Sequence, residues 1–193
     1  EITVLERKRK PTAALTLLRE TARAGKQKLL ATERIVVIDS AVVDADAALR
    51  AIRLSQECGR IDTYASTYHT TDSLGCTLYE NDLGNRRYVA LPTAQGGSQL
   101  AVTDLIGSQW QAPVPLTGLY ESMRQNYPFM MADGQTFYFA AKGDETLGGY
   151  DIYVTRYDDE QGVFLHPVNI GMPFNSEAND YLYVVDEYSR LGW

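Results

Sequence analysis

Residues 127–176 form a series of short apolar or alternating runs, each ended by turn-forming residues. Asp133-Gly134 is one such break, and aspartate followed by glycine is typical of tight turns. Four antiparallel strands within about fifty residues have the size of one β-propeller blade. Because loops on a rigid scaffold commonly carry function, this pattern favours binding over a dedicated catalytic cleft. The predicted strands are residues 128–132, 136–141, 150–157 and 163–169.

A second copy of this pattern precedes the first. Val102 aligns with Val154, an offset of 154 − 102 = 52 residues, and Pro113 aligns with Pro167, an offset of 167 − 113 = 54. A period in this range indicates an array of repeats. A third copy begins near the C-terminal end and stops at Trp193, at the start of its second strand. The strands of the upstream copy are predicted at residues 77–81, 87–91, 99–103 and 110–114.

These repeats predict a mostly β protein with two parts. Residues 59–193 are expected to form a partial β-propeller of about two and a half four-stranded blades. Residues 1–58 are expected to form an N-terminal helix/strand/helix extension. An incomplete ring leaves an open sheet edge, which invites pairing with another chain. We therefore expect the sequence to be the N-terminal part of a longer protein, with an open blade edge available for self-association.

The extension over residues 1–58 shows helical rather than alternating periodicity. Apolar residues recur on one stripe over 12–29, which predicts a helix. Residues 35–39 are an aliphatic run typical of a buried strand, and Asp44 is a candidate N-cap for a short helix over 47–54. Our hypothesis is that the strand at 35–39 supplies the edge partner of a blade.

Charge is distributed unevenly along the chain. Residues 1–34 carry nine Lys or Arg and four Asp or Glu, a net charge of +5, which leaves −12 on the remainder of a chain whose total is −7. The basic run 7–10 is typical of a solvated tail. Phosphate contacts dominate nucleic-acid binding, so the acidic body argues against a nucleic-acid partner. No apolar run approaches the ~20 residues that span a bilayer, and no membrane span is predicted.

Two cysteines and two histidines are present in the chain. Cys58 and Cys76 are compatible with a disulfide of an extracytoplasmic protein, but two buried thiols that behave as small apolar groups are favoured. His69 and His166 lack the spacing of zinc ligands. We therefore predict no metal site and no cofactor.

The segment L-G-G-Y-D-I-Y-V-T-R at 147–156, followed by P-V-N-I-G at 167–171 and N-S at 175–176, resembles the TolB-type, WD-repeat-like β-propeller repeat of Bacteroidetes envelope proteins. The similarity is specific over 127–190 and weaker over 64–126, where the G-G-x-D-I-Y core is replaced by G-G-S-Q-L. The resemblance implies a protein-interaction scaffold in the periplasm or at the outer membrane, with its signal peptide removed. It supplies no catalytic residues.

Asp151 stands at a strand start in G-G-Y-D-I-Y, directly after Gly148-Gly149. The resemblance implies that its carboxylate ties the preceding turn through backbone N–H groups, as capping carboxylates do. The alternative is a calcium ion held by Asp144, Glu145 and Asp151, since Ca²⁺ prefers oxygen ligands. No EF-hand-like spacing supports that alternative. We predict a structural turn of Gly148, Gly149 and Asp151.

The connection between the second and third copies is rich in Asn, Ser and Asp. In propellers such connections lie on a face that binds partners, and Asn175, Asn179 and Asp180 are the predicted surface contacts, together with Asn126 before the preceding blade. The predicted function is a non-catalytic scaffold that presents loops to a protein or peptide of the cell envelope. The alternative is a propeller-fold carbohydrate hydrolase or lyase, which requires converging carboxylates.

Overall fold

The computed structural model describes residues 36–71, 75–120, 124–144 and 146–193. The predicted helix over 12–29, the basic run 7–10 and Glu145 lie outside the described residues. The chain divides into two compact units. The larger unit consists of Val37–Ile170 and Phe174–Trp193, and it contains every helix and strand of the described residues.

The first sheet is antiparallel and has the strand order β1-β2-β3-β4-β5, with β6 also paired to β4. Its central strands coincide closely with the predicted upstream copy. The added strand β1 pairs with β2 over its full length, from Arg60 opposite Glu80 to Thr63 opposite Thr77. The strands are β1 (Arg60–Thr63), β2 (Thr77–Glu80), β3 (Arg86–Pro92), β4 (Ser98–Ile106), β5 (Gln109–Trp110) and β6 (Val114–Pro115).

The second sheet repeats this plan with the order β10-β9-β8-β7, and β11 also pairs with β9. A short hairpin of β12 and β13 follows it. The expectation of a mostly β fold is thereby confirmed. The strands are β7 (Arg124–Met130), β8 (Thr136–Lys142), β9 (Asp151–Asp158), β10 (Val163–Phe164), β11 (Val168–Asn169), β12 (Val185–Asp186) and β13 (Leu191–Gly192).

Hydrogen bonds show that the two sheets are built alike at the turn between their first two long strands. In the first sheet the N–H of Asn81 donates to the carbonyl of Arg86 at 3.1 Å, and in the second the N–H of Met131 donates to the carbonyl of Thr136 at 2.9 Å. Both members of the pair are displaced by the same 131 − 81 = 50 residues. The internal repeat proposed from the sequence therefore corresponds to a repeated backbone geometry.

The outer strands repeat as well, at larger offsets. Thr103 Oγ1 donates to the carbonyl of Gln111 at 2.6 Å, and Thr155 Oγ1 donates to the carbonyl of Leu165 at 2.5 Å. The offsets are 155 − 103 = 52 and 165 − 111 = 54. Two residues are thus inserted before β9 and two more before β10, which accounts for the two offsets seen in the sequence.

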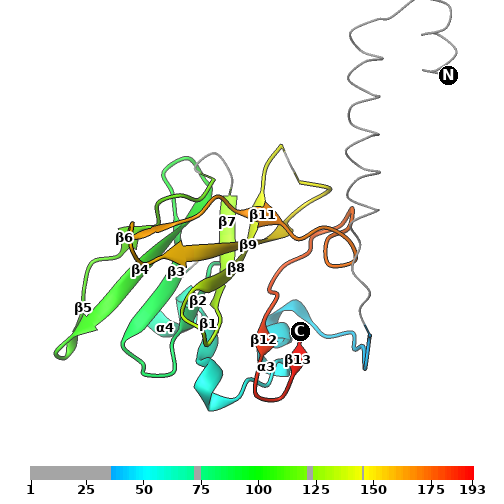
Figure 1. Ribbon diagram of the computed structural model, residues 1–193, viewed down its shortest axis with the longest axis horizontal. Coiled ribbons are helices and arrows are strands. Elements are labelled where there is room, and N and C mark those ends of the chain that lie inside the picture. Colours follow the sequence, from blue (N-terminus) through cyan, green and yellow to red (C-terminus); the bar gives the residue numbers. More distant parts are fainter. Residues whose placement is uncertain (1–35, 72–74, 121–123, 145) are drawn as a thin grey trace, which may run out of the picture. The chain divides into compact units, whose positions relative to one another are not determined.

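Aromatic rings from both sheets form the core. The strand β7 lies against β2, β3 and β4 (Figure 1). The Tyr79 ring meets the Phe129 ring edge-on with centroids 5.2 Å apart, and the Tyr88 ring lies 5.0 Å from that of Phe137. Both phenylalanines are completely buried. Burial of one such side chain stabilises the fold by about 1.5–3 kcal/mol, so this cluster holds the sheets together.

The helices of the described residues are short: α3 (Ala45–Ala51), the 3₁₀ turn η1 (Gln56–Cys58) and α4 (Tyr64–Tyr68). Asp44 occupies the predicted N-cap position of α3, but its side chain makes no capping hydrogen bond. The helix ends at Ala51, short of the predicted 54. Helix α4 was not predicted; the side chain of Thr63 caps it by accepting from the N–H of Ser66.

The predicted strand at 35–39 is wrong for the described residues 36–39, which form no strand. Val37 and Ile38 are 71% and 77% exposed. A β-branched run needs a paired neighbour and a buried face to become a strand, and the edge of β2 is already taken by β1. The edge partner that we expected at 35–39 is instead Arg60–Thr63.

Asp186 joins the segment after α3 to the β12–β13 hairpin. Its Oδ2 accepts from the N–H and the hydroxyl of Ser55 at 2.8 and 2.6 Å, and its Oδ1 accepts from the Cys58 thiol at 3.5 Å. Hydrogen bonds from Ser55 hold the pKa of Asp186 well below its ordinary value. Cys58 and Cys76 are both buried and no disulfide joins them, so the structure shows the alternative of two buried thiols.

Candidate functional site

Asp151 lies at the start of β9 and bonds the turn that precedes this strand. This side chain is fully buried, and its Oδ2 accepts from the N–H of Leu147 at 2.9 Å and from Asn169 Nδ2 at 2.7 Å. Among the described residues, no three His, Cys, Asp or Glu side chains lie close enough to hold a metal ion. The hydrogen bonds from Leu147 and Asn169 tie Asp151 to this turn and to β11.

Gly148 and Gly149 are required by the close approach of the inter-sheet connection. A Cβ on Gly148 would overlap the carbonyl oxygen of Glu177, and one on Gly149 would overlap the side-chain oxygen of Asn179. The backbone passes so closely because the N–H of Gly149 donates to the carbonyl of Ala178 at 2.8 Å. The G-G pair thus docks the connection onto the start of β9.

Two of the four predicted surface contacts are buried instead, so their predicted placement is wrong. Asn126 and Asn175 each expose only 1% of their surface. Asn175 Oδ1 accepts from the N–H of Ile152 at 2.7 Å, and its Nδ2 donates to the carbonyl of the same residue at 2.9 Å. Asn126 Oδ1 accepts from the N–H of Thr77 at 3.0 Å. Both amides satisfy backbone groups of strands.

Gln125, on β7, satisfies a backbone group of the first sheet in the same way, and the sequence analysis did not identify it. Its Oε1 accepts from the N–H of Leu100 at 3.1 Å, as Asn175 accepts from Ile152. The donors are offset by 152 − 100 = 52 residues and the amides by 175 − 125 = 50. The sequence carries a signal for this pair, because both residues have amide side chains and lie 50 positions apart, close to the repeat period. The residue type changes from glutamine to asparagine.

The other two predicted contacts lie at the surface. Asn179 is exposed and its Oδ1 accepts from the N–H of Tyr150 at 3.0 Å. Asp180 is half-buried, and its Oδ2 accepts from the N–H and the hydroxyl of Ser176 at 2.6 and 2.8 Å. The N–H of Asp180 donates to the carbonyl of Tyr150 at 2.7 Å. These contacts hold the connection beside Tyr150.

Three tyrosines gather at this connection, and the sequence analysis did not single them out. The rings of Tyr127 and Tyr181 are stacked with centroids 4.6 Å apart at 18°, and Tyr150 stands perpendicular to Tyr127 at 5.9 Å. Tyr181 is 42% exposed, and Tyr127 and Tyr150 are half-buried. We call Tyr127, Tyr150 and Tyr181 the tyrosine cluster. It presents a stacked pair of rings and a perpendicular ring beside Asn179.

Burial raises the pKa of two tyrosines of the cluster, Tyr127 and Tyr150. It raises the pKa of Tyr127 to about 12, with a smaller contribution from Tyr181. These two phenols therefore stay protonated at neutral pH and can donate hydrogen bonds. A surface that combines aromatic area with hydroxyl donors is typical of interface hot spots.

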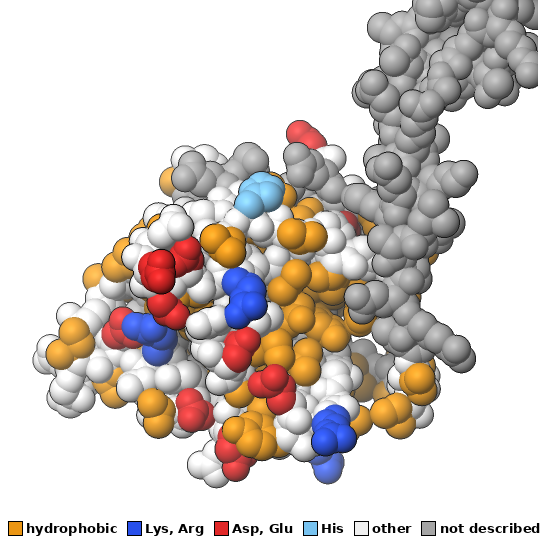
Figure 2. Space-filling view, in the orientation of Figure 1, with side chains coloured by type: hydrophobic (Ala, Val, Ile, Leu, Met, Phe, Trp, Pro, Cys, Tyr) orange, Lys and Arg blue, Asp and Glu red, His pale blue; other side chains and the backbone are white. Residues whose placement is uncertain are grey.

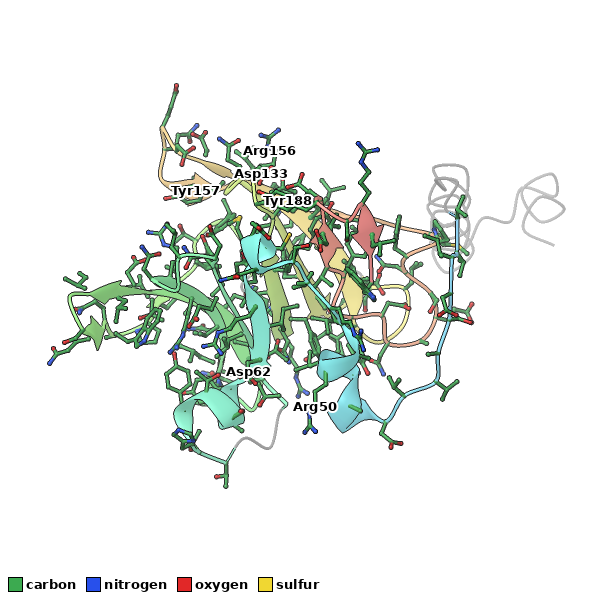
Figure 3. The ribbon with its side chains drawn as sticks, turned by 90° about the horizontal axis from the view of Figure 1, so that it is seen from below. Arg50, Asp62, Asp133, Arg156, Tyr157 and Tyr188 are labelled. Carbon is green, nitrogen blue, oxygen red and sulfur yellow. The ribbon has the colours of Figure 1, made fainter. Side chains whose placement is uncertain are left out.

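Two aspartates available to the alternative hydrolase function, Asp133 and Asp158, accept hydrogen bonds from backbone groups of their own turns. Asp133 Oδ1 accepts from the N–H groups of Gln135 and Thr136. Partial burial opposes ionisation of Asp133, but the bonds from Thr136 outweigh it and lower the pKa. Figure 3 shows Asp133 beside Arg156. Asp158 Oδ1 likewise accepts from the N–H groups of Glu160 and Gln161 in its own turn.

The two histidines lie on other elements than the tyrosine cluster, His69 at the end of α4 and His166 beside Tyr120. His69 ends α4 with a left-handed backbone, φ 51°. His166 is exposed, and its Nε2 lies 3.2 Å from the hydroxyl of Tyr120.

Comparisons of the chain with protein-family models, with curated proteins and with solved structures gave no match. In the part of the chain that the structure describes, no helix has the length and apolar character needed to cross a membrane. The geometry of the site itself therefore carries the functional argument.

Proposed function

We propose that this protein is a non-catalytic binding scaffold, built as a partial β-propeller, that presents its inter-blade loops to a protein or peptide partner. The observation that carries the proposal is the tyrosine cluster. Its rings come from β7, from the entry to β9 and from the connection that follows β11. Loops held by a rigid sheet and bearing aromatic side chains are suited to recognition without large ordering costs.

The rigidity of the connection supports this proposal. Asn175 anchors it to β9, Asp180 closes it on Ser176, and Asn179 fixes the backbone of Tyr150. A surface that is ordered before binding loses less conformational entropy when the partner arrives. The alternative function, a carbohydrate hydrolase or lyase, gains less support, because Asp133 and Asp158 serve their own turns.

The proposed location is the cell envelope, either the periplasm or the outer-membrane surface. Its support is the resemblance of residues 147–176 to propeller repeats of envelope proteins. A net charge of −7 suits a protein that stays dispersed while it binds partners. Figure 2 shows acidic and basic side chains interspersed on one face around a strip of hydrophobic side chains.

Site-specific photo-crosslinking tests the proposal. A photoreactive phenylalanine analogue replaces Tyr181, and in a control it replaces Tyr188, which is 63% exposed on the β12–β13 hairpin. We expect a discrete crosslinked partner from Tyr181 that is absent from Tyr188, and loss of that product when Tyr127 is changed to alanine. The same products from both positions, or none from Tyr181, would contradict a partner surface at the tyrosine cluster.

A further inference from the structure

Two basic side chains lie directly opposite each other at the end of the β7–β8 pair. Arg124 is the register partner of Lys142, and both are exposed. Like charges in opposite positions of an antiparallel pair are destabilising. Residues 35–193 carry a net charge of −12, so this basic pair is a local exception on an acidic body.

The basic pair is not neutralised by the described acidic residues. Ion pairs within that part of the chain involve Arg60, Arg86 and Arg87, and none involves Arg124 or Lys142. The arginines of the first sheet, by contrast, are matched to carboxylates, as Arg86 is to Asp104 at 2.6 Å. Two exposed cations that lack a carboxylate partner among the described residues can bind an anionic group of a partner through charge complementarity.

The pair borders the tyrosine cluster. In the antiparallel pair of β8 and β9, Ala141 lies opposite Asp151. Tyr150, one residue before Asp151, therefore lies opposite Lys142, which in turn lies opposite Arg124. The aliphatic stem of Arg124 packs closely against Gly97. A Cβ added to Gly97 would lie only 3.3 Å from Arg124 Cγ. Its aliphatic part is therefore packed while the guanidinium stays in water.

We infer that Arg124, Lys142 and the tyrosine cluster form one binding site for a polypeptide segment that carries carboxylate side chains. Arginine binds a carboxylate through two parallel hydrogen bonds, and lysine adds a compact second charge. The tyrosine rings supply the apolar area that a peptide side chain or backbone covers. This inference rests on the proposed scaffold function and specifies the chemistry of its partner.

Three labelled peptides of equal length test the inference by fluorescence anisotropy with the full chain. They alternate tyrosine with glutamate, with glutamine or with lysine. We expect the glutamate peptide to bind at least about tenfold more tightly than the glutamine peptide, a difference of about 1.4 kcal/mol, and to weaken as salt is added. The double variant R124Q/K142Q should remove this preference, and R124E/K142E should transfer it to the lysine peptide.

The matched control is R50Q/R53Q, which removes the same charge from two exposed arginines of the N-terminal segment; Arg50 is labelled in Figure 3. It should leave the preference for the glutamate peptide intact. Equal binding of the three peptides, binding of none, or an equal loss in R50Q/R53Q would overturn the inference. If all peptides bind equally and Tyr181→Ala abolishes that binding, the scaffold function stands and only the carboxylate chemistry fails; the Tyr181 crosslink tests the scaffold separately.

Discussion

Replacing Asn175 by alanine should lower the free energy of unfolding by about 1–3 kcal/mol. The side chain is buried and bonds both backbone groups of Ile152, the N–H at 2.7 Å and the carbonyl at 2.9 Å. Alanine leaves the Ile152 N–H without this acceptor, and a stranded buried donor costs about 1–3 kcal/mol. The Ile152 carbonyl loses one of two donors, because it also accepts from the N–H of Ile170 at 3.2 Å. The Oδ1 of Asn169 also loses the donor that lies at 2.8 Å.

Urea denaturation followed by circular dichroism measures the effect, with the comparison made at constant slope so that the midpoint alone reports stability. The matched control is Glu177→Ala, an exposed position on the same connection, which should change stability by less than about 0.5 kcal/mol. Asn175→Asp is a sharper variant. It keeps the acceptor for the Ile152 N–H, but it places a carboxylate oxygen against the Ile152 carbonyl and should be at least as destabilising at neutral pH.

A loss below about 1 kcal/mol in Asn175→Ala would refute the reasoning, because it would mean that the Ile152 N–H does not depend on the amide. Wild-type stability combined with lost partner binding would instead restore the surface role that the sequence suggested for Asn175. A similar loss is expected for Gln125→Ala, since Gln125 bonds the N–H of Leu100 in the corresponding place.

Three further outcomes are expected. Gly148→Ala should lower stability by about 1–3 kcal/mol in urea melts, because the added methyl meets the backbone of Glu177; an unchanged midpoint would show that the connection can move aside. The pKa of Asp186 is lowered, so its carboxylate stabilises the fold above the ordinary value of 3.8 and this contribution is lost as the pH falls below it; Asp186→Asn should therefore lower the melting temperature at neutral pH and flatten its acid dependence. Burial raises the pKa of Tyr127 to about 12 from 10.0, so the neutral phenol stabilises the fold below pH 10 and the contribution is lost as the pH rises towards 12; Tyr127→Phe should remove one late-titrating phenol from the alkaline absorbance titration, and an unchanged late phase would contradict its burial.

Much of the β structure was predictable from local sequence alone. The run predicted at 136–141 is Thr136–Lys142, and the run predicted at 150–157 is Asp151–Asp158. Alternation of apolar residues and turn dipeptides are local signals that survive folding. The run at 35–39 has equally strong strand propensity but finds no partner within the described residues 36–39, which shows that pairing rather than propensity decides the outcome.

The site was less predictable because its contacts join distant residues. The bond from the N–H of Leu147 to Asp151 spans only four residues, so a local pattern could suggest it. Asn175 was placed at the surface because its residue type suits loops, whereas its partner is a strand residue, Ile152, 23 positions earlier. The stacking of Tyr127 on Tyr181 depends on how the connection docks on the sheet, and no local pattern reports that.

The two sheets preserve the positions of their hydrogen-bonded backbone groups more closely than their residue types. In the first sheet Asn81 Oδ1 accepts from the N–H of Asn85 and that of the next residue, and in the second Asp133 Oδ1 accepts from the corresponding N–H groups of Gln135 and the next residue. The accepting side chains stand at different places in the turn, yet they satisfy the same two donors. A turn needs an acceptor for those donors and is indifferent to which residue supplies it. Alignment by residue identity therefore understates the repeat, and Asp186, which accepts from the N–H two positions later at Tyr188, extends the same solution to the third hairpin.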